Sequence, residues 1–276
     1  MLRYLHIPKT AGTSFGDCLE RIYPGTSFFF SGNLSRDLER YRKIPPRERR
    51  RITLFAGHSP RITGIPEIDA LPTITLLREP IARVKSFCQH VSEGKSPYLL
   101  ERFPPARFHL DDFLESGIEE LANFQTRMFL GDANYALPML EQASLVKQTM
   151  EILEHKITAF GIFEKLDTSL LMFRQTLGWR EYPVCDRLNV RNASRLVTFN
   201  SAHIAKIREL NAIDMEVYQK ACESFDTRIA QIFGSLERER SLFEHDERRS
   251  SLFWGIQNIR RHTRRRYVDK DIDHSF

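Results

Sequence analysis

The segment at positions 6–15 carries the residue types that bind an anion. It reads His-Ile-Pro-Lys-Thr-Ala-Gly-Thr-Ser-Phe. A lysine supplies positive charge, three hydroxyl residues supply donors, and two small residues let the backbone approach a ligand closely; these are Lys9, Thr10, Ala11, Gly12, Thr13 and Ser14. Between a strand and a helix, such a segment presents free backbone N–H groups at the positive end of the helix dipole. We predict that it binds an anionic group.

The spacing in this segment differs from that of a Walker A loop. In the pattern G-x-x-x-x-G-K-[ST], the lysine follows the second glycine and adjoins a hydroxyl residue. Here Lys9 precedes Gly12. The alternative interpretation is a tight strand-to-helix turn in which a serine or threonine caps the helix.

A second segment, 75–87, reads Thr-Leu-Leu-Arg-Glu-Pro-Ile-Ala-Arg-Val-Lys-Ser-Phe. Arg78 ends a predicted strand, and Ser86 lies about two turns into the predicted helix that follows. A guanidinium and a hydroxyl suit a second phosphate, although Arg78 pairing with Glu79 is an alternative. Both segments follow parallel strands, so we expect a ligand with two separated anionic groups.

Alternating strands and helices must position these segments. Short apolar runs predict strands, and helical spacing predicts helices. The strands are predicted at Leu2–Ile7, Ile52–Ala56, Pro72–Leu77 and Ile157–Phe163, and helices at Ser14–Tyr23, Ile81–Val91 and Leu166–Leu177. This alternation predicts an α/β fold with a central parallel sheet flanked by helices, similar to P-loop-containing nucleotide-binding proteins.

The rest of the chain is expected to be mainly helical. Leu110–His155 is predicted to be wholly helical, and Ser201–Phe233 to form two helices. The basic run Arg40–Arg51 is predicted to be an exposed loop. We divide the chain into a domain at 1–235 and a basic, helical C-terminal extension at 236–276. An amphipathic basic helix in that extension would contact a membrane surface.

The composition is that of an ordinary globular protein. Of 276 residues, 41% are hydrophobic and 28% charged, with a formal charge of +5; this excludes a disordered or collagen-like chain. The four cysteines lack zinc-site spacing and are predicted to be free thiols, and no metal is expected. With no leader pattern and no apolar run of about 18 residues, we expect a cytoplasmic protein, with the extension at the inner membrane surface.

The two segments resemble the cofactor-binding motifs of sulfotransferases that use 3'-phosphoadenosine 5'-phosphosulfate. The carbohydrate branch that includes the heparan sulfate 2-O-sulfotransferases and bacterial relatives is most similar. Asn123–Arg127, Gly161–Glu164 and Glu209–Tyr218 also resemble this branch, so the similarity is collinear from about residue 2 to 233. The resemblance implies an α/β fold, a sulfuryl donor whose product is 3',5'-adenosine bisphosphate, and a carbohydrate or glycolipid acceptor.

The resemblance also implies roles for individual residues. Lys9 to Ser14 would surround the 5'-phosphosulfate, with Lys9 neutralising the leaving phosphate, while Arg78 and Ser86 would hold the 3'-phosphate. That branch has its catalytic base in a Gly-His context, so His58, after Gly57, is the expected base.

The acceptor site is predicted from residue spacing. Positions 123 and 127 share a helix face, so Asn123, Gln125 and Arg127 are expected at the acceptor cleft. The alternative is that these side chains form hydrogen bonds on the helix surface. Arg40–Arg51 would suit an acidic glycan, although charge runs are usually solvated.

Two other functions stay open at this point. A P-loop-like nucleotide kinase or hydrolase would show Mg²⁺-dependent activity. A non-catalytic polyanion-binding protein would show steeply salt-dependent binding that is insensitive to loss of Lys9. No nucleic acid partner is expected.

Overall fold

The computed structural model describes residues 1–23, 25–130, 142–183, 185, 196–234, 236–238 and 240–241. Its centre is a five-stranded sheet in the order β2-β3-β1-β4-β5, and every strand pair in it is parallel. The strands are β1 (Leu2–Leu5), β2 (Thr26–Phe30), β3 (Ile52–Gly57), β4 (Thr73–Leu77) and β5 (Ala159–Ile162). The predicted parallel α/β fold is confirmed.

Strand β2 is the one strand that the sequence analysis did not predict. Its residues alternate between buried Phe28 and Phe30 and the outward-facing Phe29. A run of three phenylalanines hides this alternation, because polarity does not change along it. The strand lies at the edge of the sheet.

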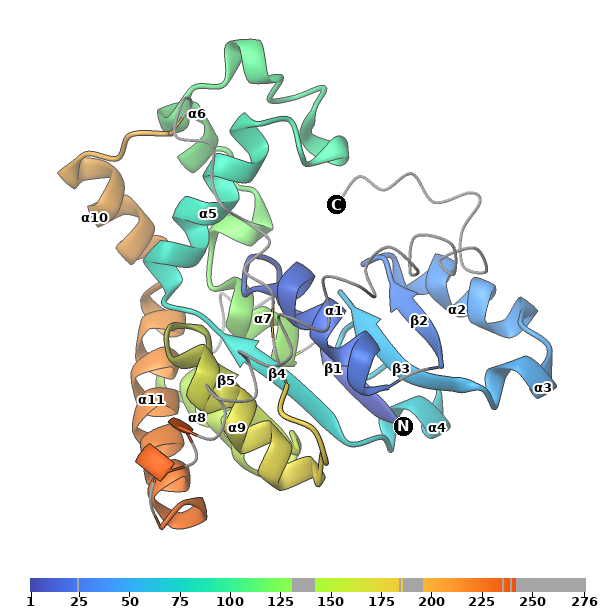
Figure 1. Ribbon diagram of the computed structural model, residues 1–276. Helices are drawn as coiled ribbons and strands as arrows, with labels where there is room; N and C mark the ends of the chain where they lie inside the picture. The colour runs from blue at the N-terminus through green and yellow to red at the C-terminus, as the bar shows by residue number, and fades with distance from the viewer. Residues whose placement is uncertain are drawn as a thin grey trace.

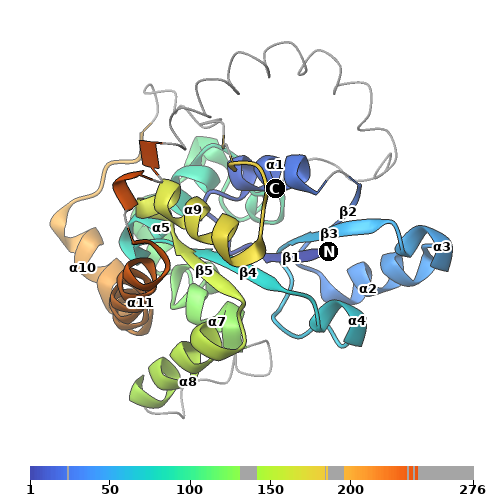
Figure 2. The same cartoon turned by 60° about the horizontal axis from the view of Figure 1, so that its bottom comes forward.

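Helices cover both faces of the sheet (Figures 1 and 2). One face carries α1 (Gly12–Ile22) and α9 (Leu166–Leu177), and the other carries α2 (Leu34–Lys43), α4 (Pro66–Asp69), α7 (Phe124–Leu130) and α8 (Gln142–His155). On the first face, the Phe15 ring meets Tyr4 of β1 edge-on at 4.9 Å and stacks on Phe173 of α9 at 5.6 Å. Apolar side chains of α1, α7, α8 and α9 therefore share one core with the sheet, while α2 and α4 pack on β2 and β3 in a second cluster that includes Phe28, Tyr41 and Ile68.

The remaining helices pack beside the sheet, on its β4 and β5 side. They are α5 (Pro80–Ser92), α6 (Leu110–Leu114), α10 (Ser201–Leu210) and α11 (Ala212–Ile232), with short 3₁₀ helices η1 (Pro97–Leu99), η2 (Pro105–Arg107), η3 (Glu119–Leu121) and η6 (Phe163–Lys165). A separate apolar cluster, which includes Phe87, Phe113 and Ile207, holds α5, α6 and α10 together. The two helices predicted within 201–233 are confirmed.

Two helix and loop predictions were wrong. Residues 110–155 are not wholly helical, because α6, η3, α7 and α8 are separate elements. Gly117 and Asn123 have φ angles of 72° and 47°, which interrupt a right-handed helix. The basic run is not a loop either: it forms the end of α2 and the short α3 (Pro46–Arg49). Proline is tolerated in the first turn of a helix, so Pro46 starts α3 rather than preventing it.

The described part of the chain ends soon after α11. Residues 236–238 and 240–241 are helical, and the rest of the predicted C-terminal extension lies outside the described residues. Among the described residues, no helix has the length and apolarity needed to cross a membrane. The four cysteines are free, with Cys18 and Cys88 buried and Cys185 and Cys222 partly buried.

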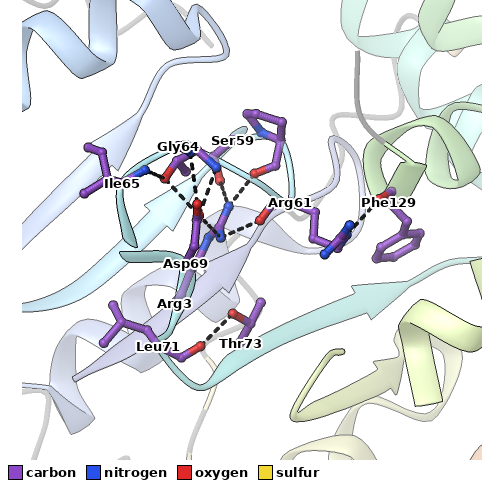
Figure 3. Close-up of polar contacts among 11 residues, drawn as sticks. Arg3, Ser59, Arg61, Gly64, Ile65, Asp69, Leu71, Thr73 and Phe129 are labelled. Atoms are coloured by element: carbon purple, nitrogen blue, oxygen red, sulfur yellow. Dashed lines mark hydrogen bonds and ion pairs between the residues drawn. The ribbon is translucent and has the colours of Figure 1, made fainter. Parts of the chain in front are cut away.

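Buried Arg3 of β1 organises the segment 59–69, which connects β3 to β4 through α4 (Figure 3). Its guanidinium donates to Arg61 O at 2.7 Å, Asp69 Oδ1 at 3.2 Å and Ser59 Oγ at 3.0 Å, and also to the carbonyl of Pro60. Burial lowers the pKa of Arg3 to about 10, and Asp69 opposes this shift. Arg3 therefore stays charged near neutral pH and ties this connection to the sheet.

We expect Arg3→Met to lower the free energy of unfolding by about 3 kcal/mol, because it removes the charged partner of the partly buried Asp69 carboxylate and a donor to several other acceptors. Urea denaturation measures this loss. The matched control is Lys43→Met, which breaks an exposed pair with Glu39 and is expected to leave the free energy of unfolding essentially unchanged. An equal, small change in both variants would contradict a structural role for Arg3.

Candidate active site at the carboxyl edge of the sheet

The predicted site residues come from three neighbouring strands that end at the same edge. The segment 6–11 follows β1, His58 follows β3, and Arg78 follows β4. Since β1 lies between the other two strands, the loop that carries Lys9 stands in the middle. This edge, where the connections diverge to opposite sides of β1, is where parallel α/β sheets bind ligands.

The loop after β1 has an unusual backbone. Lys9 and Ala11 have φ angles of 70° and 71°, in the left-handed region that non-glycine residues rarely adopt. A backbone in which positive and negative φ angles alternate turns successive N–H groups to one side and forms an anion-binding concavity. Helix α1 begins after Ala11 without a side-chain cap, which argues against the alternative of a Ser/Thr-capped turn. Strained backbone of this kind concentrates at functional sites.

The hydroxyl residues of the loop do not act alike. Thr10 is fully buried and donates its hydroxyl hydrogen to Ile7 O at 2.8 Å within the loop, and its predicted role in holding the ligand stays a prediction. Ser14, in the first turn of α1, is partly exposed. The Thr13 side chain lies outside the described residues.

Position 12 must be a glycine, because the ring of a histidine that the sequence analysis did not single out lies against it. A Cβ on Gly12 would lie 1.8 Å from two atoms of the His6 ring. That ring stacks on Tyr4, and its buried Nε2 has no hydrogen-bond partner among the residues that the structure describes. An unsatisfied buried nitrogen beside the anion-binding loop suits a ligand group at this place.

Arg78 joins the two predicted motifs. Its Nη1 donates to Lys9 O at 2.9 Å, and its guanidinium lies 4.5 Å from the centre of the Phe163 ring. Glu79 caps α5 instead, because its carboxylate accepts the N–H groups of Ile81 and Ala82. Ser86 is partly exposed, and α5 places it about 9 Å along the helix axis from Pro80.

His58 is held in one tautomer. Its Nδ1 lies 3.0 Å from His6 O, and a carbonyl oxygen can only accept, so Nδ1 carries the hydrogen and Nε2 is the basic nitrogen. Burial lowers the pKa of His58, and Lys9 lowers it further, while the hydrogen bond to His6 acts in the opposite direction. His58 is therefore a neutral imidazole near pH 7, with Nε2 available to take a proton.

The backbone around His58 is equally constrained. Gly57 has a φ angle of 112°, and a Cβ there would lie 2.3 Å from Phe30 O. Only glycine fits this close approach of β3 to β2. The His58 N–H then donates to Phe30 O at 3.0 Å, which fixes where the side chain leaves the sheet.

Two further histidines belong to this neighbourhood. The ring centroids of His6 and His58 are 4.5 Å apart, and burial, followed by the charges of His58 and Lys9, lowers the pKa of His6. On α5, burial followed by the charge of Lys9 lowers the pKa of His90 to about 4. The sequence feature that could have identified His90 is its position four residues after Ser86, which puts both residues on the same helix face.

The residues predicted at the acceptor cleft have structural contacts. Asn123 precedes α7, so the argument from a shared helix face was wrong, and its Oδ1 accepts the N–H groups of Ile213 and Asp214. Gln125 is buried and exchanges two hydrogen bonds with the backbone of Arg78. These two side chains therefore stabilise the protein scaffold around the site.

Arg127, the third of these residues, lies elsewhere. With Lys206, Leu114 and Leu210 it lines a cavity of about 300 Å³ between η3, α7 and α10. Its predicted contact with an acceptor stays a prediction. Among the described residues, no group of three or more His, Cys, Asp or Glu side chains is arranged to hold a metal ion.

The sheet order defines the class of protein: a parallel α/β protein whose architecture is compatible with a P-loop-like fold. Residues 65–257 match the family model of galactose-3-O-sulfotransferase, over more than half of the chain. The chain therefore belongs to the galactose-3-O-sulfotransferase family, a family of carbohydrate sulfotransferases. The match begins beyond Lys9 and His58 and includes Arg78 and Ser86.

The predicted resemblance to carbohydrate sulfotransferases is confirmed at this level. The matched family is named for the 3-O position of galactose, whereas the sequence motifs were most similar to the heparan sulfate 2-O branch. No curated protein matches the chain.

Proposed function

We propose that this protein transfers a sulfuryl group from 3'-phosphoadenosine 5'-phosphosulfate to a hydroxyl group of a galactoside. Membership of the family supports sulfuryl transfer to a carbohydrate, and the family name suggests galactose as the acceptor. The donor and the roles of individual residues rest on the motifs and on the geometry of the carboxyl edge.

The loop residues fit a donor with two anionic ends. Lys9 and the uncapped N-terminus of α1 suit the phosphosulfate, and the orphaned Nε2 of His6 lies beside them. Arg78 and Ser86, after β4, suit the 3'-phosphate. The donor, when bound, supplies the sulfur atom whose bond to the phosphate oxygen breaks as its bond to the acceptor oxygen forms.

This chain's residues then handle the proton and the charge. Nε2 of His58 takes the proton of the acceptor hydroxyl, since Nδ1 is committed to His6 O. Lys9 and the N–H groups at the start of α1 stabilise the negative charge that develops on the leaving phosphate. Holding these groups on three adjacent strands keeps them aligned for displacement at sulfur.

The observation that carries this proposal is the hydrogen bond from Arg78 Nη1 to Lys9 O at 2.9 Å. It places both predicted anion-binding groups, which lie 69 residues apart, at one edge of the sheet. A nucleotide with two separated anionic groups is the ligand that this pairing suits.

The first experiment is calorimetric titration with 3',5'-adenosine bisphosphate in the absence of metal, with ATP as the comparison. We expect micromolar binding of the bisphosphate, about −8 kcal/mol, and much weaker binding of ATP. Mg²⁺-dependent binding of ATP without binding of the bisphosphate would replace this proposal with the nucleotide kinase.

A further inference from the structure

The order of strands defines a direction along the carboxyl edge. From β4 through β1 to β3, the edge carries Arg78, then Lys9, then His58. In the proposed function, these groups hold the 3'-phosphate, stabilise the leaving phosphate and accept the proton. Neighbouring strands are about 4.8 Å apart, so the next position in this direction, on β2, is one strand beyond the base.

The residue of β2 whose ring meets that of His58 is Phe29, which pairs with Ala56 of β3, two positions before His58. Its ring is 40% exposed, while Phe28 and Phe30 on either side are buried. The ring centroid lies 6.1 Å from that of His58, with the two planes at 82°. Phe29 therefore presents an apolar surface directly beside the proposed base.

The surroundings hold Phe29 in place without burying its ring. Phe28 packs edge-on against Tyr41 of α2 at 5.5 Å, which anchors β2 through its other face. After the strand, the Ser31 N–H donates to Asp37 Oδ2 at 2.7 Å and fixes the turn into α2. The stability of β2 thus comes from its buried face, and the exposed ring adds little to it.

Galactose has the chemistry to use such a surface. Its axial O4 leaves several C–H groups together on one face of the ring, and this apolar face packs on an aromatic ring. Singly exposed apolar side chains are common, so exposure alone carries no argument here. The argument rests on the position of Phe29 beside His58, whose Nε2 is the proposed base. A sugar stacked on Phe29 directs a hydroxyl group to that nitrogen.

We propose that the exposed ring of Phe29 is the platform on which the acceptor galactoside stacks, next to His58. This inference rests on the proposed function and adds to it a residue that selects the acceptor.

The test uses methyl β-galactoside as the acceptor and two variants that remove the aromatic ring, Phe29→Ala and Phe29→Leu. Leucine keeps an apolar side chain on the strand, so Phe29→Leu guards against a folding defect. We expect both variants to raise the KM for the galactoside about tenfold, with kcat changed less than threefold and the Kd of 3',5'-adenosine bisphosphate unchanged. Tyr98→Ala, which removes another exposed aromatic ring in η1, is the matched control and should leave all three values unchanged.

A direct binding measurement separates this inference from the proposed function. Phe29→Trp keeps an aromatic platform, and its fluorescence, compared with wild type, is expected to change saturably on titration with methyl β-galactoside in the presence of the bisphosphate. Such a change without turnover would support the platform and overturn sulfuryl transfer. Turnover with an unchanged KM in Phe29→Ala and Phe29→Leu would overturn the platform alone. If the protein shows no turnover and no fluorescence change, both the proposed function and the platform are overturned.

Discussion

Replacing His58 with asparagine is expected to lower kcat by about 10²- to 10⁴-fold, the contribution typical of a general base. The asparagine amide can still donate to His6 O, as Nδ1 does at 3.0 Å, but it has no basic nitrogen in place of Nε2. The fold and the Kd of 3',5'-adenosine bisphosphate should therefore be preserved. Steady-state kinetics and calorimetry measure the two effects separately.

The pH profile gives an independent check on His58. The base acts when neutral, so kcat/KM falls as the pH drops through its pKa. Because burial and Lys9 lower this pKa, the acid limb is expected below pH 6.5. The matched control is His90→Asn, since the pKa of His90 is lowered to about 4. Loss of turnover in His90→Asn, with an acid limb near pH 4 in the wild type, would transfer the role of base to His90.

Replacing Lys9 with methionine is expected to lower kcat by about 10²- to 10³-fold, since it removes the one side-chain charge of the loop that faces the leaving phosphate in the proposed function. Binding of the bisphosphate should weaken by about tenfold or more. Methionine keeps the length of the side chain and isolates the effect of the charge. Rapid-quench kinetics and calorimetry measure the two losses.

The same variant has a second, diagnostic consequence. Lys9 lowers the pKa of His58, so its removal raises that pKa and moves the acid limb of the residual activity to higher pH. Lys9→Arg keeps the charge and should keep the limb where it is in the wild type. An unchanged limb in Lys9→Met would mean that His58 is not the titrating base.

Much of the site was predictable from local patterns. The strand Leu2–Leu5 and the helix Gly12–Ile22 follow from apolar runs and helical spacing, and they leave Lys9 in the loop between them. Pro80 marks the start of α5, because proline is favoured in the first turn. Each of these signals is local to its own segment, the range in which backbone preferences and side-chain periodicity operate.

The partners of several predicted site residues could not be read from the sequence. Thr10 has the right type for a ligand donor, but its hydroxyl is satisfied by Ile7 O in a loop whose φ angles the sequence does not reveal. Asn123 and Gln125 lie in a segment that resembles the family, yet their amides brace α11 and the backbone of Arg78. Whether a polar side chain serves a ligand or the scaffold depends on partners far away in the chain.

The sequence by itself therefore determined the class of fold, the family resemblance, and the two loops and the histidine that the proposed chemistry needs. Only the tertiary structure decided that Arg78 reaches Lys9 O, that His6 fixes the tautomer of His58, and that Phe29 stands beside it. The physical reason is that parallel strands bring together residues about 30 to 70 positions apart through register and buried hydrogen bonds. Those contacts are set by the packing of the whole sheet and leave no periodic trace along the chain.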